Sequence, residues 1–229
     1  MKAFAVCKTA IRAMLVLICV LTSSVAMAQV NYGDFSGNGV EFRDVTETVQ
    51  TADPAVLWDA PAIVGPDATL LFFPAAFVSS CVEGSNDITA SQLTTTIVAQ
   101  GSNTLGTLEL MDNGDVALLK FPALGDPATN ASANISGTLT VTEDLGGAIA
   151  PLVIPFAAPG VALSLPGDFG VNTWTGSVMV DIASQVPNAT RADLVFDNAL
   201  GTNCGPDNTG GRIQKKVVQV TVTIGEPDT

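Results

Sequence analysis

The chain has 229 residues, with 22 acidic residues against nine basic ones, no histidine and a formal net charge of −13. An acidic excess of this size repels nucleic acids and anionic membrane surfaces, so neither is expected as a partner. The lack of histidine excludes Ser-His-Asp and Cys-His catalysis as well as histidine-ligated zinc sites.

The first 28 residues have the pattern of a secretory signal peptide. Basic residues come first, an apolar run over Met14–Leu21 follows, and Ala26–Ala28 forms an A-x-A cleavage site. The apolar run is shorter than the roughly 20 residues of a bilayer span, and no later stretch is apolar enough. We therefore expect a signal peptide over 1–28, one β-sandwich domain over 29–229 without a transmembrane segment, and secretion to the cell surface, the extracellular space or the periplasm.

Cysteine usage agrees with export. Cys7 and Cys19 would leave with the signal peptide, so only Cys81 and Cys204 remain. In an oxidising compartment such a pair predicts one disulfide. By the chain-entropy model, closing so long a loop stabilises the fold by roughly 4–5 kcal/mol.

Apolar and polar residues then alternate with period two, the pattern of half-buried strands. The alternation is clearest over residues 93–99, 135–142, 174–182, 192–197 and 218–224. Further strands are expected over Val40–Val45, Thr69–Phe73, Thr104–Leu110, Val116–Phe121, Leu152–Phe156 and Val161–Leu165. Many short strands at this spacing predict an all-β, antiparallel, jelly-roll-like β-sandwich of about 10–12 strands.

One turn signal stands out between two of these strands. Asn113 and Gly114 lie between Leu110 and Val116, and an Asn-Gly pair flanked by alternating apolar residues is typical of a tight hairpin. We therefore expect the chain to reverse direction at Asn113 and Gly114.

Two acidic segments are candidate calcium sites. Asp34, Ser36 and Asn38 supply oxygens with the spacing of the first half of an acidic calcium loop, although its twelfth position would be Val45. Asp112 and Asp115 flank the expected hairpin and offer two carboxylates. The alternatives are a glycine-rich lead into the first strand and a plain hairpin turn. Calcium is the only cofactor that the sequence suggests.

The basic residues allow two interpretations each. Lys120 lies in an apolar strand, where it can guard a sheet edge or, beside a buried acid, form an isopeptide with an Asn. Arg212, Lys215 and Lys216 form a basic cluster, expected either to pair locally on the surface or to meet an acidic face of another subunit.

Four segments resemble a group of exported bacterial β-sandwich proteins that often carry a PEP-CTERM sorting tail. They are Gly33–Glu47, Leu57–Gly65, Leu70–Phe77 and Asp87–Ile97. The resemblance covers roughly residues 33–120 and implies an extracellular, cell-envelope or matrix location without an assigned activity. The Pro-Glu-Pro tail of that group is missing here, so anchoring by that route is not expected.

These observations favour a secreted, non-enzymatic structural or adhesive protein of the cell surface or extracellular matrix, self-assembling as a homo-oligomer or filament. The alternative is an extracellular module that binds calcium or surface glycans. A hydrolase with paired carboxylates is disfavoured, because one tyrosine and two tryptophans furnish a sugar cleft poorly.

Overall fold

The computed structural model describes residues 28–53, 56–120, 129–206 and 208–226, so nearly all of the predicted signal peptide lies outside the described residues. Within these ranges the chain is almost entirely strand, with one four-residue helix, α2 (Ile182–Gln185), and no helix long and apolar enough to cross a membrane. The strands are β1 (Gln29–Ser36), β2 (Val40–Val49), β3 (Ala62–Val64), β4 (Ala68–Phe72), β5 (Val78–Val82), β6 (Asn86–Ala99), β7 (Thr104–Lys120), β8 (Asn130–Asp144), β9 (Gly147–Ala157), β10 (Val161–Ser164), β11 (Gly170–Asp181), β12 (Ala189–Asn203) and β13 (Thr209–Gly225).

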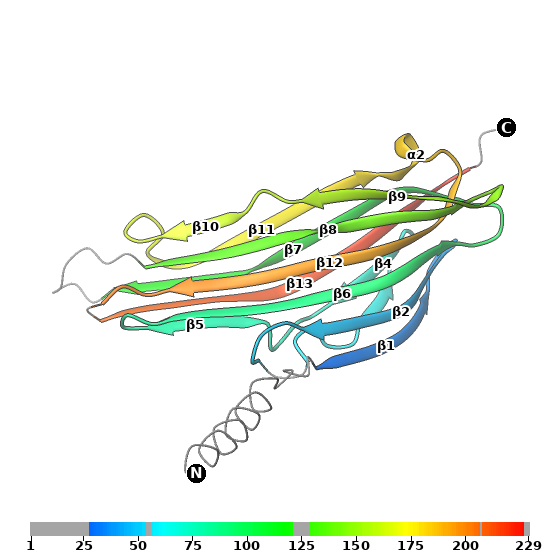
Figure 1. Ribbon diagram of the computed structural model, residues 1–229. Coiled ribbons are helices and arrows are strands. Elements are labelled where there is room, and N and C mark those ends of the chain that lie inside the picture. Colours follow the sequence, from blue (N-terminus) through cyan, green and yellow to red (C-terminus); the bar gives the residue numbers. More distant parts are fainter. Residues whose placement is uncertain (1–27, 54–55, 121–128, 207, 227–229) are drawn as a thin grey trace, which may run out of the picture.

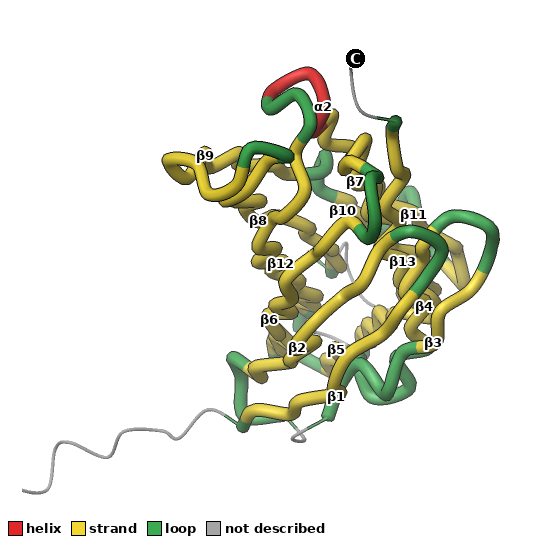
Figure 2. Tube along the Cα trace, turned by 90° about the vertical axis from the view of Figure 1, so that its right-hand side faces the viewer, coloured by secondary structure: helices red, strands yellow, loops and turns green. Residues whose placement is uncertain are grey.

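The strands form two sheets that pack face to face (Figures 1 and 2). In the described ranges the seven-stranded sheet has the order β1-β2-β6-β12-β8-β10, with β9 also on β8. The six-stranded sheet has the order β11-β7-β13-β4-β3, with β5 also on β13. All these pairings are antiparallel, which confirms the predicted antiparallel β-sandwich.

The predicted alternation places the core correctly. Along β12, Ala192, Leu194 and Phe196 are buried while their neighbours are partly exposed. The other four alternating segments also turn their apolar positions mainly inward, on β6, β8, β11 and β13. Because side chains on a strand point alternately to its two faces, one row from each sheet fills the space between the layers.

Strand β7 differs from the prediction. The expected hairpin at Asn113 and Gly114 is wrong, because β7 runs straight through both residues and pairs with β11 and β13 along its length. Gly114 is needed for a close approach instead: a Cβ there would lie 1.9 Å from the backbone oxygen of Gln214. The opposite strand bulges at this point, since Lys215 pairs with Gly114 but Val217 already pairs with Asn113.

The predicted disulfide is present. Cys81 on β5 and Cys204 just after β12 are bonded, and their Cα atoms lie 5.7 Å apart. Because β5 belongs to one sheet and β12 to the other, the bond ties the two layers together. Gly211 on β13 lies against it, and a Cβ there would come within 3.1 Å of the Cys81 sulfur.

Candidate functional site

The most unusual group of side chains lies between the two sheets and consists of Asp112, Asn198 and Lys215, which we call the central cluster. Asp112 and Lys215 come from β7 and β13, neighbours in the six-stranded sheet, and Asn198 comes from β12 in the facing sheet. The Lys215 Nζ is in direct contact with Asp112 Oδ2, and Asn198 Nδ2 donates a hydrogen bond of 3.1 Å to the same oxygen. One carboxylate oxygen therefore holds both the amine and the carboxamide.

Aromatic rings enclose the amine. The Lys215 Nζ lies 5.1 Å from the ring centre of Phe77 and 5.0 Å from that of Trp174. The missing side chain at Gly114 makes room for the indole, because a Cβ there would come within 2.9 Å of Trp174 Nε1. The side chains of both Lys215 and Asp112 have no exposed surface at all. The central cluster is therefore closed to solvent and to dissolved substrates.

Burial changes the acid-base behaviour of the pair. It lowers the pKa of Lys215 and raises the pKa of Asp112, since removal from water disfavours both charged forms. The mutual attraction of the two groups opposes these shifts without cancelling them. Both directions favour transfer of a proton from the amine to the carboxylate, which would give a neutral amine beside a carboxylic acid.

The hydrogen bonding of the central cluster is incomplete. Among the described residues, the buried polar atoms without a partner include Asp112 Oδ1, Asn198 Oδ1 and Trp174 Nε1. Buried polar atoms without partners are rare and costly in folded proteins. An ion pair kept for stability alone would be expected to satisfy them.

A second buried acid, Glu47 on β2, is arranged differently. Its carboxylate accepts hydrogen bonds from the Tyr32 hydroxyl at 2.6 Å, the Leu57 backbone N–H at 3.0 Å and the Ser91 hydroxyl at 3.0 Å. Burial, followed by the hydrogen bond and the charge of Glu47, raises the pKa of Tyr32. The residue ties β1, β2, β6 and the segment before β3 together.

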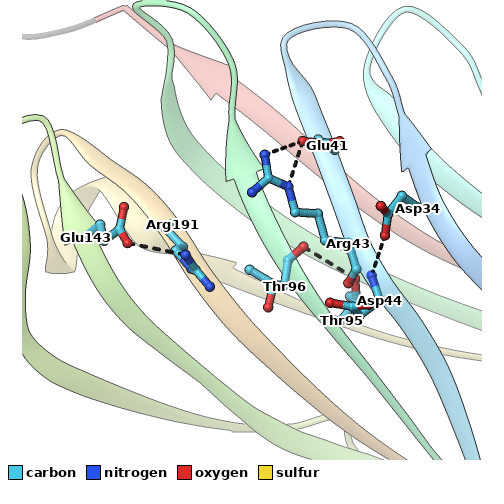
Figure 3. Close-up of polar contacts among 8 residues, drawn as sticks. All are labelled: Asp34, Glu41, Arg43, Asp44, Thr95, Thr96, Glu143 and Arg191. Atoms are coloured by element: carbon cyan, nitrogen blue, oxygen red, sulfur yellow. Dashed lines mark hydrogen bonds and ion pairs between the residues drawn. The ribbon is translucent and has the colours of Figure 1, made fainter.

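The first predicted calcium segment lies at the end of β1. Asp34, Ser36 and Asn38 are all exposed there. Asp34 Oδ1 accepts a hydrogen bond of 2.8 Å from the Asp44 backbone N–H (Figure 3), and Asn38 Nδ2 donates to the Pro66 carbonyl oxygen at 3.1 Å. Two of the three side chains thus already have protein partners. In the part of the chain that the structure describes, no group of three or more acidic or cysteine side chains is arranged to hold a metal ion.

The second predicted calcium segment does not form one site. Asp112 points into the core, whereas Asp115 lies on the opposite face of β7, partly exposed and 3.5 Å from the Lys216 ammonium. Residues three apart on a strand point to opposite faces, so the two carboxylates cannot bind the same ion. The calcium interpretation of Asp112 and Asp115 is therefore wrong.

The predicted basic cluster also divides. Arg212 and Lys216 are exposed, but Lys215 is buried in the central cluster, so the expected surface group of three is wrong. Lys215 and Lys216 point to opposite faces because successive residues on a strand do so. Lys120 is the last residue of β7: it pairs with Thr209 of β13, while the pairing with β11 ends at Leu118.

The outer face of the seven-stranded sheet carries polar pairs. Arg43 meets Glu41 through two nitrogens, at 2.6 and 2.8 Å, and Arg191 lies 3.4 Å from Glu143 (Figure 3). The Asp193 carboxylate accepts a hydrogen bond of 2.7 Å from the Thr96 hydroxyl. These charges are mostly matched on the surface itself.

A groove of about 380 Å³ lies between the edge strands β9 and β11 of the two sheets. Its apolar lining includes Ile154, Phe156 and Met179, with Asp181 and Gln185 at the end near α2. Met179 is 68% exposed, a large fraction for an apolar side chain. The alternation predicted β11, but the sequence held no signal that its edge would lie beside β9.

No protein-family model and no curated protein matches the sequence. Distant similarity to solved structures was found for the enzymatically active domain of tailspike protein 4 from bacteriophage CBA120 (14% identity, TM-score 0.19), of which this chain covers 19%, with 86% of this chain aligned. Another is TmCBM61 in complex with beta-1,4-galactotriose (9% identity, TM-score 0.20, 71% of this chain and 88% of that one).

A third is the CBM22-1 xylan-binding domain from Paenibacillus barcinonensis (11% identity, TM-score 0.21, 87% of this chain and 94% of that one). The chain thus spans about a fifth of the length of that tailspike domain. At such TM-scores these similarities say nothing about what this chain binds.

Proposed function

We propose that this protein is an exported, non-enzymatic structural or adhesive module of the cell surface or extracellular matrix. The observation that carries the proposal is the position of its reactive side chains. The amine, carboxylate and carboxamide of Lys215, Asp112 and Asn198 face one another inside the sandwich, where no substrate reaches them. Groups so placed hold the fold together rather than act on dissolved molecules.

The disulfide supports the same role. Cys81 and Cys204 join the two sheets, and such bonds persist in oxidising compartments outside the cytoplasm. The acidic excess keeps an exported protein soluble at high concentration. A covalent tie between sheets, together with a sealed core, suits a module that must keep its shape outside the cell.

Fractionation of cells that express the full chain tests this proposal. We expect the protein, cut after Ala28, in the surface-extracted or matrix fraction, with the Cys81–Cys204 bond formed. A chain that keeps residues 1–28 and stays in the cytoplasm with both thiols free would refute the proposal.

Self-association is the expected mode of assembly, through the exposed edge of β11. This strand pairs only with β7 among the described strands and presents Val171 and Met179, 76% and 68% exposed. An edge strand with free backbone groups is a template for pairing with another chain.

Met179→Lys should lower the sedimentation coefficient of the assembled protein. Ile88→Lys, at a 57% exposed position on β6 of the other sheet, is the matched control and should have no effect. A monomer at every concentration would refute this mode of assembly.

A second candidate function, binding of a glycan, is favoured by the groove between β9 and β11. Apolar side chains beside the polar groups of Asp181 and Gln185 are the mixture that ligand pockets use. A glycan array tests this binding. Signals that are lost in Gln185→Ala would support it, provided that they persist in Gln92→Ala, on the outer face of the seven-stranded sheet. A blank array would refute it.

A further inference from the structure

The surroundings of Lys215 are those of a reactive amine nucleophile. Its amine is fully buried, lies against two aromatic rings, and makes its polar contact with Asp112. A lysine in such a setting is the kind of amine that reacts in proteins, because burial favours its neutral form. The carboxamide of Asn198 hydrogen-bonds to the same carboxylate oxygen, and its own oxygen has no partner.

We propose that Lys215 and Asn198 are joined by an intramolecular isopeptide bond that links the two sheets, with Asp112 carrying the protons. This inference does not depend on the function proposed above. The sequence suggested such a bond at Lys120. The structure assigns it to Lys215, because this lysine contacts the buried acid Asp112, which also accepts a hydrogen bond from the buried Asn198.

The reaction balances without any added reagent. The Lys215 ammonium gives a proton to Asp112, and the neutral amine attacks the Asn198 Cγ to form a carbon–nitrogen bond. Asp112 then takes the remaining excess proton from the attacking nitrogen as it passes one to Asn198 Nδ2. The bond from Cγ to Nδ2 breaks, ammonia leaves, and a neutral amide stands beside a protonated Asp112.

The pKa directions agree with these protonation states. Burial lowers the pKa of Lys215 and raises that of Asp112, and both directions favour transfer of the ammonium proton to the carboxylate before the attack. Both proton transfers follow contacts that exist, from Nζ to Oδ2 and between Oδ2 and Nδ2. No water has to enter the core.

The topology favours Asn198 over Asp112 as the acceptor of the new bond. Lys215 and Asp112 are on neighbouring strands of one sheet, already joined by backbone hydrogen bonds. Asn198 is on β12 in the facing sheet. Asp112 contacts both reacting groups. A proton carrier must do so, whereas an acceptor of the new bond needs to contact only the amine.

Intact-mass measurement on the reduced, denatured protein tests the bond. The mature chain should be lighter than its sequence by one ammonia, about 17 Da. Because an N-terminal glutamine also loses ammonia on cyclisation, the measurement uses Gln29→Ser. Tandem mass spectrometry of a proteolytic digest should then find the peptide containing Asn198 linked to the one containing Lys215, which also excludes a succinimide at Asn113.

Variants assign the roles. Lys215→Met, Asn198→Ala and Asp112→Ala should each restore the full mass, while Lys216→Met, at the neighbouring exposed lysine, should keep the loss. The wild-type digest decides the question even where a variant fails to fold. Folded wild-type protein of full mass would overturn the proposal. A loss of one water, about 18 Da, with Lys215 linked to Asp112 would overturn the assignment to Asn198.

Discussion

Two acids, Glu47 and Asp112, are fully buried, and they differ in how many of their oxygens have hydrogen-bond partners. Glu47 accepts hydrogen bonds from a phenol, a serine hydroxyl and a backbone N–H. Asp112 meets a buried amine and a carboxamide, while its second oxygen has no partner. A buried carboxylate such as Glu47, whose hydrogen-bond donors are in place, is accounted for by a structural role.

A structural role alone does not account for the central cluster. Its amine lies against two aromatic rings, and two of its polar atoms, Asp112 Oδ1 and Asn198 Oδ1, lack partners. Conversion of the Lys215 amine and the Asn198 carboxamide into an amide would remove the ammonium charge and the need to bury an ion pair. The difference between the two sites is therefore one of chemistry as well as of hydrogen bonding.

The largest expected effect comes from Asp112→Ala. It removes the partner of the Lys215 amine and prevents the cross-link, so the free energy of unfolding should fall by about 3–5 kcal/mol. Urea denaturation followed by tryptophan fluorescence measures the loss. A loss below about 1 kcal/mol would show that the carboxylate contributes little to the fold.

The double variant Asp112→Leu/Lys215→Met sharpens this test. Replacing a simple buried ion pair by apolar residues is often neutral or stabilising. A cross-linked wild type should instead be more stable than the double variant and should unfold more slowly. A double variant at least as stable as the wild type would indicate an ordinary ion pair.

A smaller effect is expected at Glu47. Glu47→Ala leaves the Leu57 N–H and the Ser91 hydroxyl buried without their acceptor and should cost about 3 kcal/mol, measured by urea denaturation. Glu47→Gln keeps one acceptor oxygen and should cost about 1 kcal/mol. The control is Glu109→Ala, on the exposed face of β7. Equal losses for Ala and Gln would mean that the negative charge, not the oxygen, satisfies these donors.

The sequence predicted which face is buried in the five alternating segments, because that depends only on alternation along one chain. Leu194 and Phe196 on β12 illustrate this, as do Val218 and Val220 on β13. The disulfide followed from counting, since removal of the predicted signal peptide would leave Cys81 and Cys204 without other partners. Neither prediction required information on which strands are neighbours in the sheets.

The central cluster could not be predicted in this way. It depends on how β13 pairs with β7, a strand far from it in the sequence, and on the bulge in that pairing. The Asn113-Gly114 pair predicts a turn, whereas in the structure Gly114 allows the close approach of the Gln214 backbone. One signal was available: counting in twos from Ile213 places Lys215 inward, whereas counting back from Val218 places Lys216 inward. That break in the alternation marks the bulge.

Tyr32→Phe tests the Glu47 site by pH. It removes one hydrogen bond to the carboxylate and should cost about 1.5 kcal/mol at neutral pH. The folded-state pKa of Tyr32 lies above its unfolded value of about 10, so the contribution is complete below pH 10 and declines as the pH rises beyond it. Melting temperatures from pH 7 to 11 should therefore fall more steeply for the wild type than for the variant. Parallel curves would show that Tyr32 titrates normally in the folded protein.

The smallest effect is expected for the surface pair Arg191 and Glu143, the solvent-exposed counterpart of the two buried acids. Their side chains are 39% and 42% exposed and lie 3.4 Å apart. A double-mutant cycle with Arg191→Ala and Glu143→Ala should give a coupling energy of about 0.5 kcal/mol or less. Because exposed charges are screened, the coupling should disappear at about 1 M salt. A coupling above about 1 kcal/mol that persists in salt would show that this face is shielded from water, as expected if another copy or a ligand covers the outer sheet.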